Sequence, residues 1–348
     1  MKCRILCLCL CMLVVLLAGT LHAQETGGSN TQELLDRIDE LEKRLRRLDD
    51  ESKARKKLEI TEEERLQREK EVLDTVGSEY MLDPQRTLSI DYSFNYAYQP
   101  SELLTKDDAF TLDRNVDHTM THTIGVGYSV LDNLSASMSL PFVYRYNRVG
   151  TEDELDETDI GDMSFGVGIE PWKTDESAIR TTFSFSAGLP TGRSRFKINP
   201  EHELSTGSGV YSVGASANFS KQVDPVVLFW KVGYSHAFPL DNLDYRVAEG
   251  VTLEEYNPGD SISIGGGLAW AMSYVVSINM SFSYGYSLSS KYTYNTYTQE
   301  SGDSAGASFG LGMGYRISPK TTLSFSLGYG LTGSGFSLGF RAPFSFVL

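Results

Sequence analysis

Eight charged residues of this 348-residue chain stand where the neighbouring sequence has Ser, Gly, Ala or Asn at every second position. They are Asp91, Asp117, Arg145, Asp162, Arg180, Lys231, Arg316 and Arg341. On the small-residue face of β-strands, such charges can form rings that select ions by sign, with a mild preference for anions because bases outnumber acids. They can equally pair with one another and only stabilise the fold, and the sequence leaves both interpretations open.

The histidines do not form a recognisable catalytic or metal site. His118 and His122 would share one face of a strand, but four residues of strand separate them by about 13 Å, too far for one metal ion. Neither these two nor His202 and His236 stand in the context of a catalytic triad. We therefore expect no catalytic residue, no cofactor and no metal, so the chain is not expected to be an enzyme.

Three segments between the strands carry concentrated charge. Residues 148–159 and 239–259 are acidic, but they lack the spacing of a calcium loop, so we expect solvated loops. The segment 190–208 contains Arg193, Arg195 and Lys197. It would make a basic constriction if it folded inward, and we expect it to stay outside.

The elements that must position these side chains are β-strands. From Ile278 to Leu288, apolar and aromatic residues alternate with Ser, Asn and Gly, which is the period of a strand with one greasy face. Twelve such segments follow residue 86: 88–98, 116–130, 134–146, 160–170, 178–189, 209–220, 226–238, 260–272, 275–289, 305–317, 321–331 and 336–348.

The connections between these segments favour a membrane barrel over a soluble sandwich. Short turns alternate with long loops, and aromatic residues gather near the strand ends as in two interfacial girdles. We therefore predict an all-β fold, a 12-stranded antiparallel transmembrane β-barrel over residues 86–348 with both ends in the periplasm. Pro141 and Pro343 cannot donate a ladder hydrogen bond, so we place bulges or frayed pairing there.

The residues before the barrel predict a secretion signal and a periplasmic helix. Residues 1–23 have the basic start, short apolar core and Ala23 of a cleaved signal peptide, and they contain all four cysteines. Short linkers at 24–30 and 77–85 flank a charged helical segment, 31–76. Its apolar residues form a coiled-coil seam of Leu34, Ile38, Leu41, Leu45 and Leu48. The seam would allow homo-oligomers; a single helix or a disordered linker is the alternative.

Cleavage of that signal would remove Lys2 and Arg4 and change the formal charge from −15 to −17. So acidic a chain is not expected to bind nucleic acid.

Two short motifs resemble a known family. Residues 158–166 (TDIGDMSFG) and 187–192 (AGLPTG) are similar to a Gly-Asp strand start and a Leu-Pro-Thr-Gly strand end in outer-membrane proteins of the meta-pathway of phenol degradation. The resemblance covers the barrel region and leaves out the coiled coil. It implies transport of small, often aromatic compounds and brings no catalytic residues.

These observations lead to two competing expectations. The first is a channel in the cell outer membrane, surrounded by lipid, through which small solutes, aromatic ones among them, pass passively. The second is a structural or interaction protein in which the barrel anchors the periplasmic coiled coil.

Overall fold

The computed structural model describes residues 40–41, 43–44, 82, 84–106, 110–149, 153–172, 179–199, 202–223, 225–248, 250–273, 275–318, 321–333 and 335–347. The chain divides into two compact units, Met1–Glu64 and Arg65–Leu348. Every strand that the structure describes belongs to the second unit. The predicted signal peptide lies outside the described residues.

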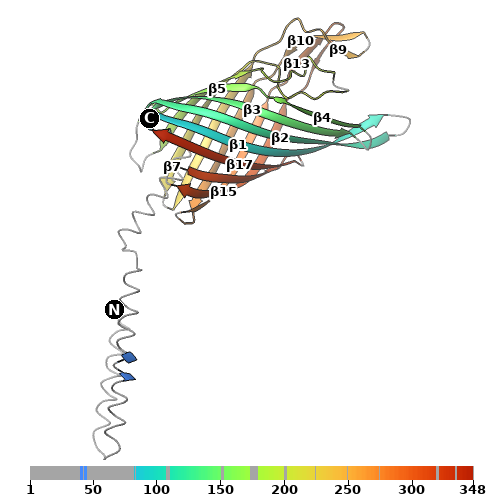
Figure 1. Ribbon diagram of the computed structural model, residues 1–348. Coiled ribbons are helices and arrows are strands. Elements are labelled where there is room, and N and C mark those ends of the chain that lie inside the picture. Colours follow the sequence, from blue (N-terminus) through green and yellow to red (C-terminus); the bar gives the residue numbers. More distant parts are fainter. Residues whose placement is uncertain are drawn as a thin grey trace, which may run out of the picture. The chain divides into compact units, whose positions relative to one another are not determined.

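The second unit is an antiparallel barrel whose strands follow one another around the wall (Figure 1). The wall strands are β1 (Thr87–Lys106), β2 (Phe110–Leu131), β3 (Leu134–Val149), β4 (Asp153–Ile160), β5 (Met163–Ile169), β6 (Arg180–Leu189), β7 (Ser212–Val223), β8 (Val226–Ala237), β11 (Ser261–Ala271), β12 (Val276–Ser287), β15 (Ser304–Ser318), β16 (Thr321–Gly330) and β17 (Phe336–Val347). These thirteen strands occupy twelve places, because β4 and β5 pair with successive parts of β3 as one interrupted strand. The predicted strand number is confirmed.

The barrel closes between its first and last strands. β1 pairs with β17 without interruption, from Thr87 opposite Val347 to Tyr98 opposite Phe336. Closure removes sheet edges, which a bilayer could not satisfy with hydrogen bonds. The C-terminal end of β17 lies at the short-turn end of the barrel, away from β9, β10 and β13 (Figure 1).

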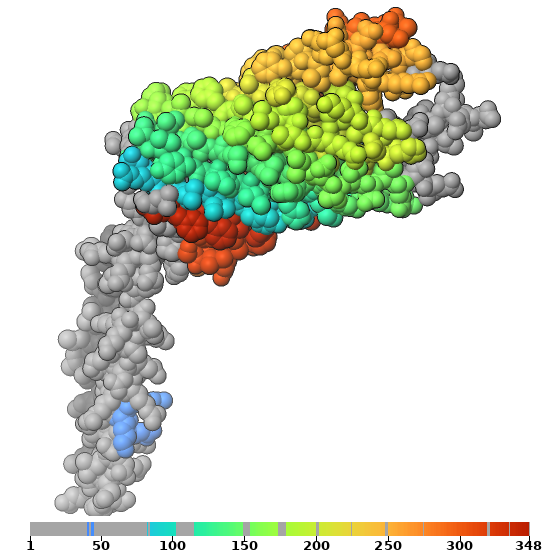
Figure 2. Space-filling view, turned by 45° about the horizontal axis from the view of Figure 1, so that its top comes forward, coloured from blue at the N-terminus to red at the C-terminus, as the bar shows by residue number. Residues whose placement is uncertain are grey.

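A second sheet stands at the long-loop end, where the sequence had predicted only loops. Segments 239–259 and 290–304 contain β9 (Tyr245–Ala248), β10 (Val251–Asn257), β13 (Lys291–Tyr294) and β14 (Thr298–Glu300), which pair in the order β14-β13-β10-β9. We call this sheet the cap. Figure 2 shows it, in gold and orange, standing above one end of the barrel. The prediction of a solvated loop at 148–159 is also partly wrong, because β4 pairs with β3 there and extends the wall.

The apolar faces of the wall strands are exposed on the outside of the barrel. Ile264, Phe282, Leu311 and Leu327 each expose about half or slightly less of their side-chain area in a closed sheet. A soluble protein of this size would bury such residues in its core. The small-residue face of each strand must therefore enclose the interior, and the apolar face is placed to contact hydrocarbon.

Serine and glycine on the inner face are matched across strands. Directly opposite partners are Gly127 with Ser89, Gly166 with Ser137, Gly168 with Ser135, Gly188 with Ser212, Gly214 with Ser186, Gly233 with Ser263, Gly310 with Ser281, Gly314 with Ser277, Gly328 with Ser337 and Gly339 with Ser326. In each pair a Cβ on the glycine would come within 3.0 Å of the serine hydroxyl. The hydroxyl thus occupies the space that the missing side chain leaves, and this explains why both residue types are needed.

Pro141 and Pro343 lie at interruptions of the ladder, as predicted. Pro141 stands opposite the break between β4 and β5, where its carbonyl accepts a hydrogen bond from the Gly161 amide at 2.8 Å. Pro343 pairs with Asp91 of β1, whereas the pairing of β17 with β16 ends at Arg341. The backbone N–H groups that the two prolines lack are therefore not needed for a strand-to-strand hydrogen bond.

Of the predicted coiled-coil seam, only Leu41 lies among the described residues. Glu40, Leu41, Lys43 and Arg44 are helical, and Leu41 exposes 59% of its surface. Leu34, Ile38, Leu45 and Leu48 lie outside the described residues. Among the helices that the structure describes, none has the length and apolarity needed to cross a membrane.

The two faces of β12 offer a direct test of the barrel's orientation. Met280 points outward and is 44% exposed, and its neighbour Ser281 points inward. Met280→Arg would bring a charge into hydrocarbon and should lower the free energy of unfolding by about 2–4 kcal/mol. Ser281→Arg should cost far less, because its side chain enters the barrel. Urea unfolding in lipid vesicles measures both, and equal costs would contradict this orientation.

Candidate functional site

Two pairs of the predicted inner-face charges neutralise each other across neighbouring strands. The Arg341 guanidinium of β17 donates from Nε to Asp91 of β1 at 2.6 Å and forms an ion pair with the same carboxylate. Arg145 of β3 forms an ion pair with Asp117 of β2. For these four residues, pairing is the role that the geometry supports.

The remaining predicted bases lie nearer the short-turn end. Arg180 forms an ion pair with the buried Glu170, with 3.3 Å between Nε and Oε1. Glu170 directly follows β5 and was not among the predicted site residues. Lys231 and Arg316 form no ion pair with another described residue. Lys231 lines a cavity of about 440 Å³ together with Leu82, Asn218 and other residues.

Leu82 reaches this cavity from the segment that precedes β1. Its side chain faces Gly168 of β5 so closely that a Cβ there would meet it at 3.0 Å. Nearby, the Gln85 amide donates to the Asp132 carboxylate at 2.9 Å, and the Arg86 amide donates to the Ser129 carbonyl at 2.8 Å. The chain before β1 is therefore fixed to the β2–β3 turn, and a leucine occupies part of the interior.

Asp162 holds the segment 190–211 against the inner wall. Its carboxylate accepts hydrogen bonds from the Gly192 amide at 3.0 Å and from both the amide and the hydroxyl of Ser208 at 2.6 Å. No larger side chain fits at Gly192, because a Cβ would meet the Gly207 backbone at 2.8 Å. Asp162 is thus an anchor for a loop, a role that the strand pattern did not predict.

The segment 190–211 folds inward, so the prediction that it stays outside is wrong. Arg145 Nη1 donates to the Ser205 carbonyl at 2.9 Å, and the Thr206 hydroxyl donates to the Ile160 carbonyl at 2.8 Å. Arg193 pairs with Glu157 of β4 and, at 3.0 Å, with Glu203. We call this segment the inserted loop. The charge of Arg193 is thus compensated by two carboxylates, and this offsets part of the cost of bringing the loop inward.

The cap packs on the inserted loop through an apolar cluster. Phe196 and Val210 of the loop are buried against Leu253 and Tyr256 of β10. The Phe196 and Tyr256 rings lie 5.0 Å apart between centroids, and Tyr292 of β13 lies 4.9 Å from Tyr256. The loop and the cap therefore form one structure over the long-loop end of the barrel.

The base of the cap is also fixed to the wall. Asp260, between β10 and β11, accepts a hydrogen bond from the Tyr234 hydroxyl at 2.6 Å and lies 2.6 Å from His236 Nδ1. These hydrogen bonds, with Tyr234 the larger contributor, lower the pKa of the Asp260 carboxyl. Asp260 is therefore ionised at neutral pH.

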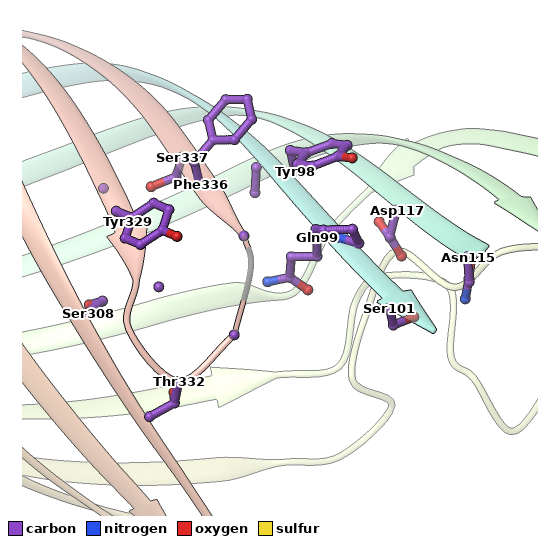
Figure 3. A pocket seen from close by; sticks show the side chains of 16 residues that line it. Tyr98, Gln99, Ser101, Asn115, Asp117, Ser308, Tyr329, Thr332, Phe336 and Ser337 are labelled. Atoms are coloured by element: carbon purple, nitrogen blue, oxygen red, sulfur yellow. The ribbon is translucent and has the colours of Figure 1, made fainter. Parts of the chain in front are cut away.

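A cavity of about 570 Å³ opens at the rim where β16 turns into β17. Gln99 and Asp117, on neighbouring strands, lie beside the turn that carries Thr332 (Figure 3). The inner-face residues Ser308 and Ser337 also line it. The inner face is thus accessible from this rim.

The two strand histidines face outward, away from this interior. His122 Nδ1 lies 2.9 Å from the Tyr92 hydroxyl, and His118 Nδ1 lies 2.8 Å from that of Tyr96. They belong to the aromatic girdle at the long-loop end, where polar ring edges suit the membrane interface. Within the described ranges, no three His, Cys, Asp or Glu side chains are placed to hold a metal ion.

This geometry defines a class of protein: a closed barrel of twelve strands with an apolar outer belt and a polar interior is an outer-membrane β-barrel. Solved structures of the class are similar. An outer membrane channel from Pseudomonas putida F1 matches 77% of this chain and 98% of its own at 12% identity and a TM-score of 0.59.

Two further structures show weaker similarity. One is the translocator domain of the autotransporter NalP from Neisseria meningitidis (12% identity, 79% of this chain and 93% of that chain, TM-score 0.44). The other is a mutant of the monoaromatic hydrocarbon channel TodX (8% identity, 76% and 91%, TM-score 0.42).

The chain belongs to the family described as "Putative MetA-pathway of phenol degradation", whose model matches residues 105–335, well over half its length. The resemblance found in the two short motifs is confirmed. Both motifs contribute to the anchor of the inserted loop, since Asp162 lies in one and Thr191 and Gly192 in the other.

The anchoring role of Asp162 can be tested by proteolysis. Asp162→Ala removes three hydrogen bonds to a charged group, each contributing about 1.5–3 kcal/mol. Trypsin cleavage after Arg195 or Lys197 should become about tenfold faster or more in vesicles. Asp159→Ala is the control, because among the described residues Asp159 accepts a hydrogen bond only from the neighbouring Ile160 amide. An unchanged cleavage rate for Asp162→Ala would contradict the role.

Proposed function

We propose that the protein is a passive channel for small solutes, aromatic ones among them, in the cell outer membrane. The observation that carries the proposal is the inner face, which carries serine and glycine instead of large side chains and lines cavities of about 570 and 440 Å³. A protein that only anchored another segment would have no need of such an interior.

Family membership supports this proposal, and so does the fold shared with a channel from Pseudomonas putida F1. The short turns and the two chain ends of the barrel would lie on the periplasmic side, and the cap would face outward. Solutes would then meet the cap and the inserted loop before they reach the inner wall. No enzymatic activity is proposed.

The charges that would set ion preference are the bases without an ion-pair partner among the described residues. Asp91, Asp117, Arg145, Arg180 and Arg341 are neutralised by pairing, and Asp162 is held by hydrogen bonds from the inserted loop. Lys231 and Arg316 remain, and Lys231 lines an inner cavity. We infer that these two give the channel its preference for anions.

Planar bilayers test the channel directly. Purified protein should give discrete conductance steps with a preference for chloride over potassium, and Lys231→Glu should shift the reversal potential toward cation preference. Lys221→Glu is the control. Lys221 lies on the outward face of β7, so the change should leave the reversal potential unchanged. A folded barrel that never conducts would overturn the proposal, and liposome swelling with solutes of graded size would set the size limit.

A second role is proposed for the N-terminal segment 31–76. Leu41 is helical and largely exposed, so its side chain is available to pack against a partner helix. We infer that the segment 31–76 joins copies of the chain or attaches the barrel to a periplasmic partner.

Deleting residues 30–76 separates the two roles. The deletion should leave solute permeability unchanged and abolish assembly into oligomers or attachment to the envelope, as measured by native electrophoresis and cross-linking in cells. Loss of permeability with unchanged assembly would contradict this division of roles.

A further inference from the structure

A cavity of about 380 Å³ lies between the inserted loop and the cap. Its walls combine aliphatic side chains with four aromatic ones, which are Phe196 from the loop, Tyr245 from β9, and Tyr292 and Tyr294 from β13. Its size and composition are those of a site for a small organic molecule. Aromatic walls from two separate segments can hold a flat ring by stacking and edge contacts.

Three charged residues also line this cavity, and only one of them lacks a partner. Arg145 is held by Asp117 and by the Ser205 carbonyl. Glu203 accepts from Arg193 at 3.0 Å and from the Asn199 amide at 3.0 Å. Arg195 forms no ion pair with any described residue. The cavity therefore presents one uncompensated positive charge.

Tyr245 and Tyr292 stay protonated at neutral pH. Burial raises the pKa of Tyr245 and, together with the neighbouring Tyr256, that of Tyr292, and the positive charge of Arg195 only partly opposes the shift at Tyr292. The Tyr245 hydroxyl can consequently donate a hydrogen bond to an anion, whereas the Tyr292 hydroxyl is hydrogen-bonded to Tyr256. A guanidinium beside a neutral donor matches a carboxylate, which accepts two parallel hydrogen bonds.

We propose that this cavity binds a single-ring aromatic carboxylate, its ring against the wall that Phe196 and the tyrosines form and its carboxylate on Arg195. The inference rests on the proposed channel function, because it makes the cavity the first site that a solute meets. Arg145 connects the cavity to the inner wall of β3, so a bound anion lies at the start of the path inward.

Binding of benzoate to the full protein in lipid nanodiscs tests the proposal, with benzyl alcohol and benzylamine as neutral and cationic probes of the same ring size. Benzoate should bind at least about tenfold more tightly than either, because a charge-assisted hydrogen bond would be lost. Equal binding of the three probes, or tighter binding of benzylamine, would overturn the assignment. Cyclohexanecarboxylate, which lacks the aromatic ring, should bind more weakly than benzoate.

The Arg195→Gln variant locates the site. It should weaken benzoate binding about tenfold or more and leave benzyl alcohol unaffected, whereas Lys197→Gln in the same loop should bind benzoate as the unaltered protein does. Unchanged benzoate binding by Arg195→Gln would overturn the site. Benzoate binding can be measured whether or not the protein conducts, and conductance of the unaltered protein can be measured without benzoate. Failure of this site and failure of the channel are therefore distinguishable.

Discussion

Every feature of this protein depends on the need to pair backbone hydrogen-bonding groups where no water can satisfy them. An unpaired backbone N–H or C=O group in the bilayer core costs several kcal/mol, so a β-sheet that spans the membrane must close into a barrel. Here β1 and β17 complete the ring over their full shared length. The period of two then assigns the large apolar side chains to the outside, and the inside receives serine and glycine that fit one another across the strands.

A wall of small residues gives an interior that side chains do not fill, and the structure narrows it with material from elsewhere in the chain. The inserted loop is fixed by Asp162 and Arg145, two charges that stand on the inner wall. The cap packs on that loop through Phe196 and Leu253. The wall charges therefore act chiefly as attachment points and as pairs. The bases proposed to act on solutes are those that form no ion pair with a described residue: Lys231, Arg316 and Arg195.

The sequence predicted the wall well because strand periodicity is a local signal. The twelve strands, the closure and the positions of Pro141 and Pro343 all follow from alternation and turn residues. The cap was missed because β9 and β14 are too short for a pattern to register. The inserted loop was assigned outside because its anchors, Asp162 and Ser208, are far apart in sequence. The pairing of Arg145 with Asp117 was open to prediction, since both stand on one face of adjacent strands.

The central claim is that the apolar face of each strand contacts lipid and the small-residue face contacts water inside the barrel. Single cysteines at positions 280, 281, 282 and 283 of β12 test it most directly, in vesicles and on a background without native cysteines. A water-soluble thiol reagent should label Ser281→Cys and Ser283→Cys, and a lipid-soluble reagent should label Met280→Cys and Phe282→Cys. Labelling that does not alternate, or that alternates in the opposite sense, would contradict the account.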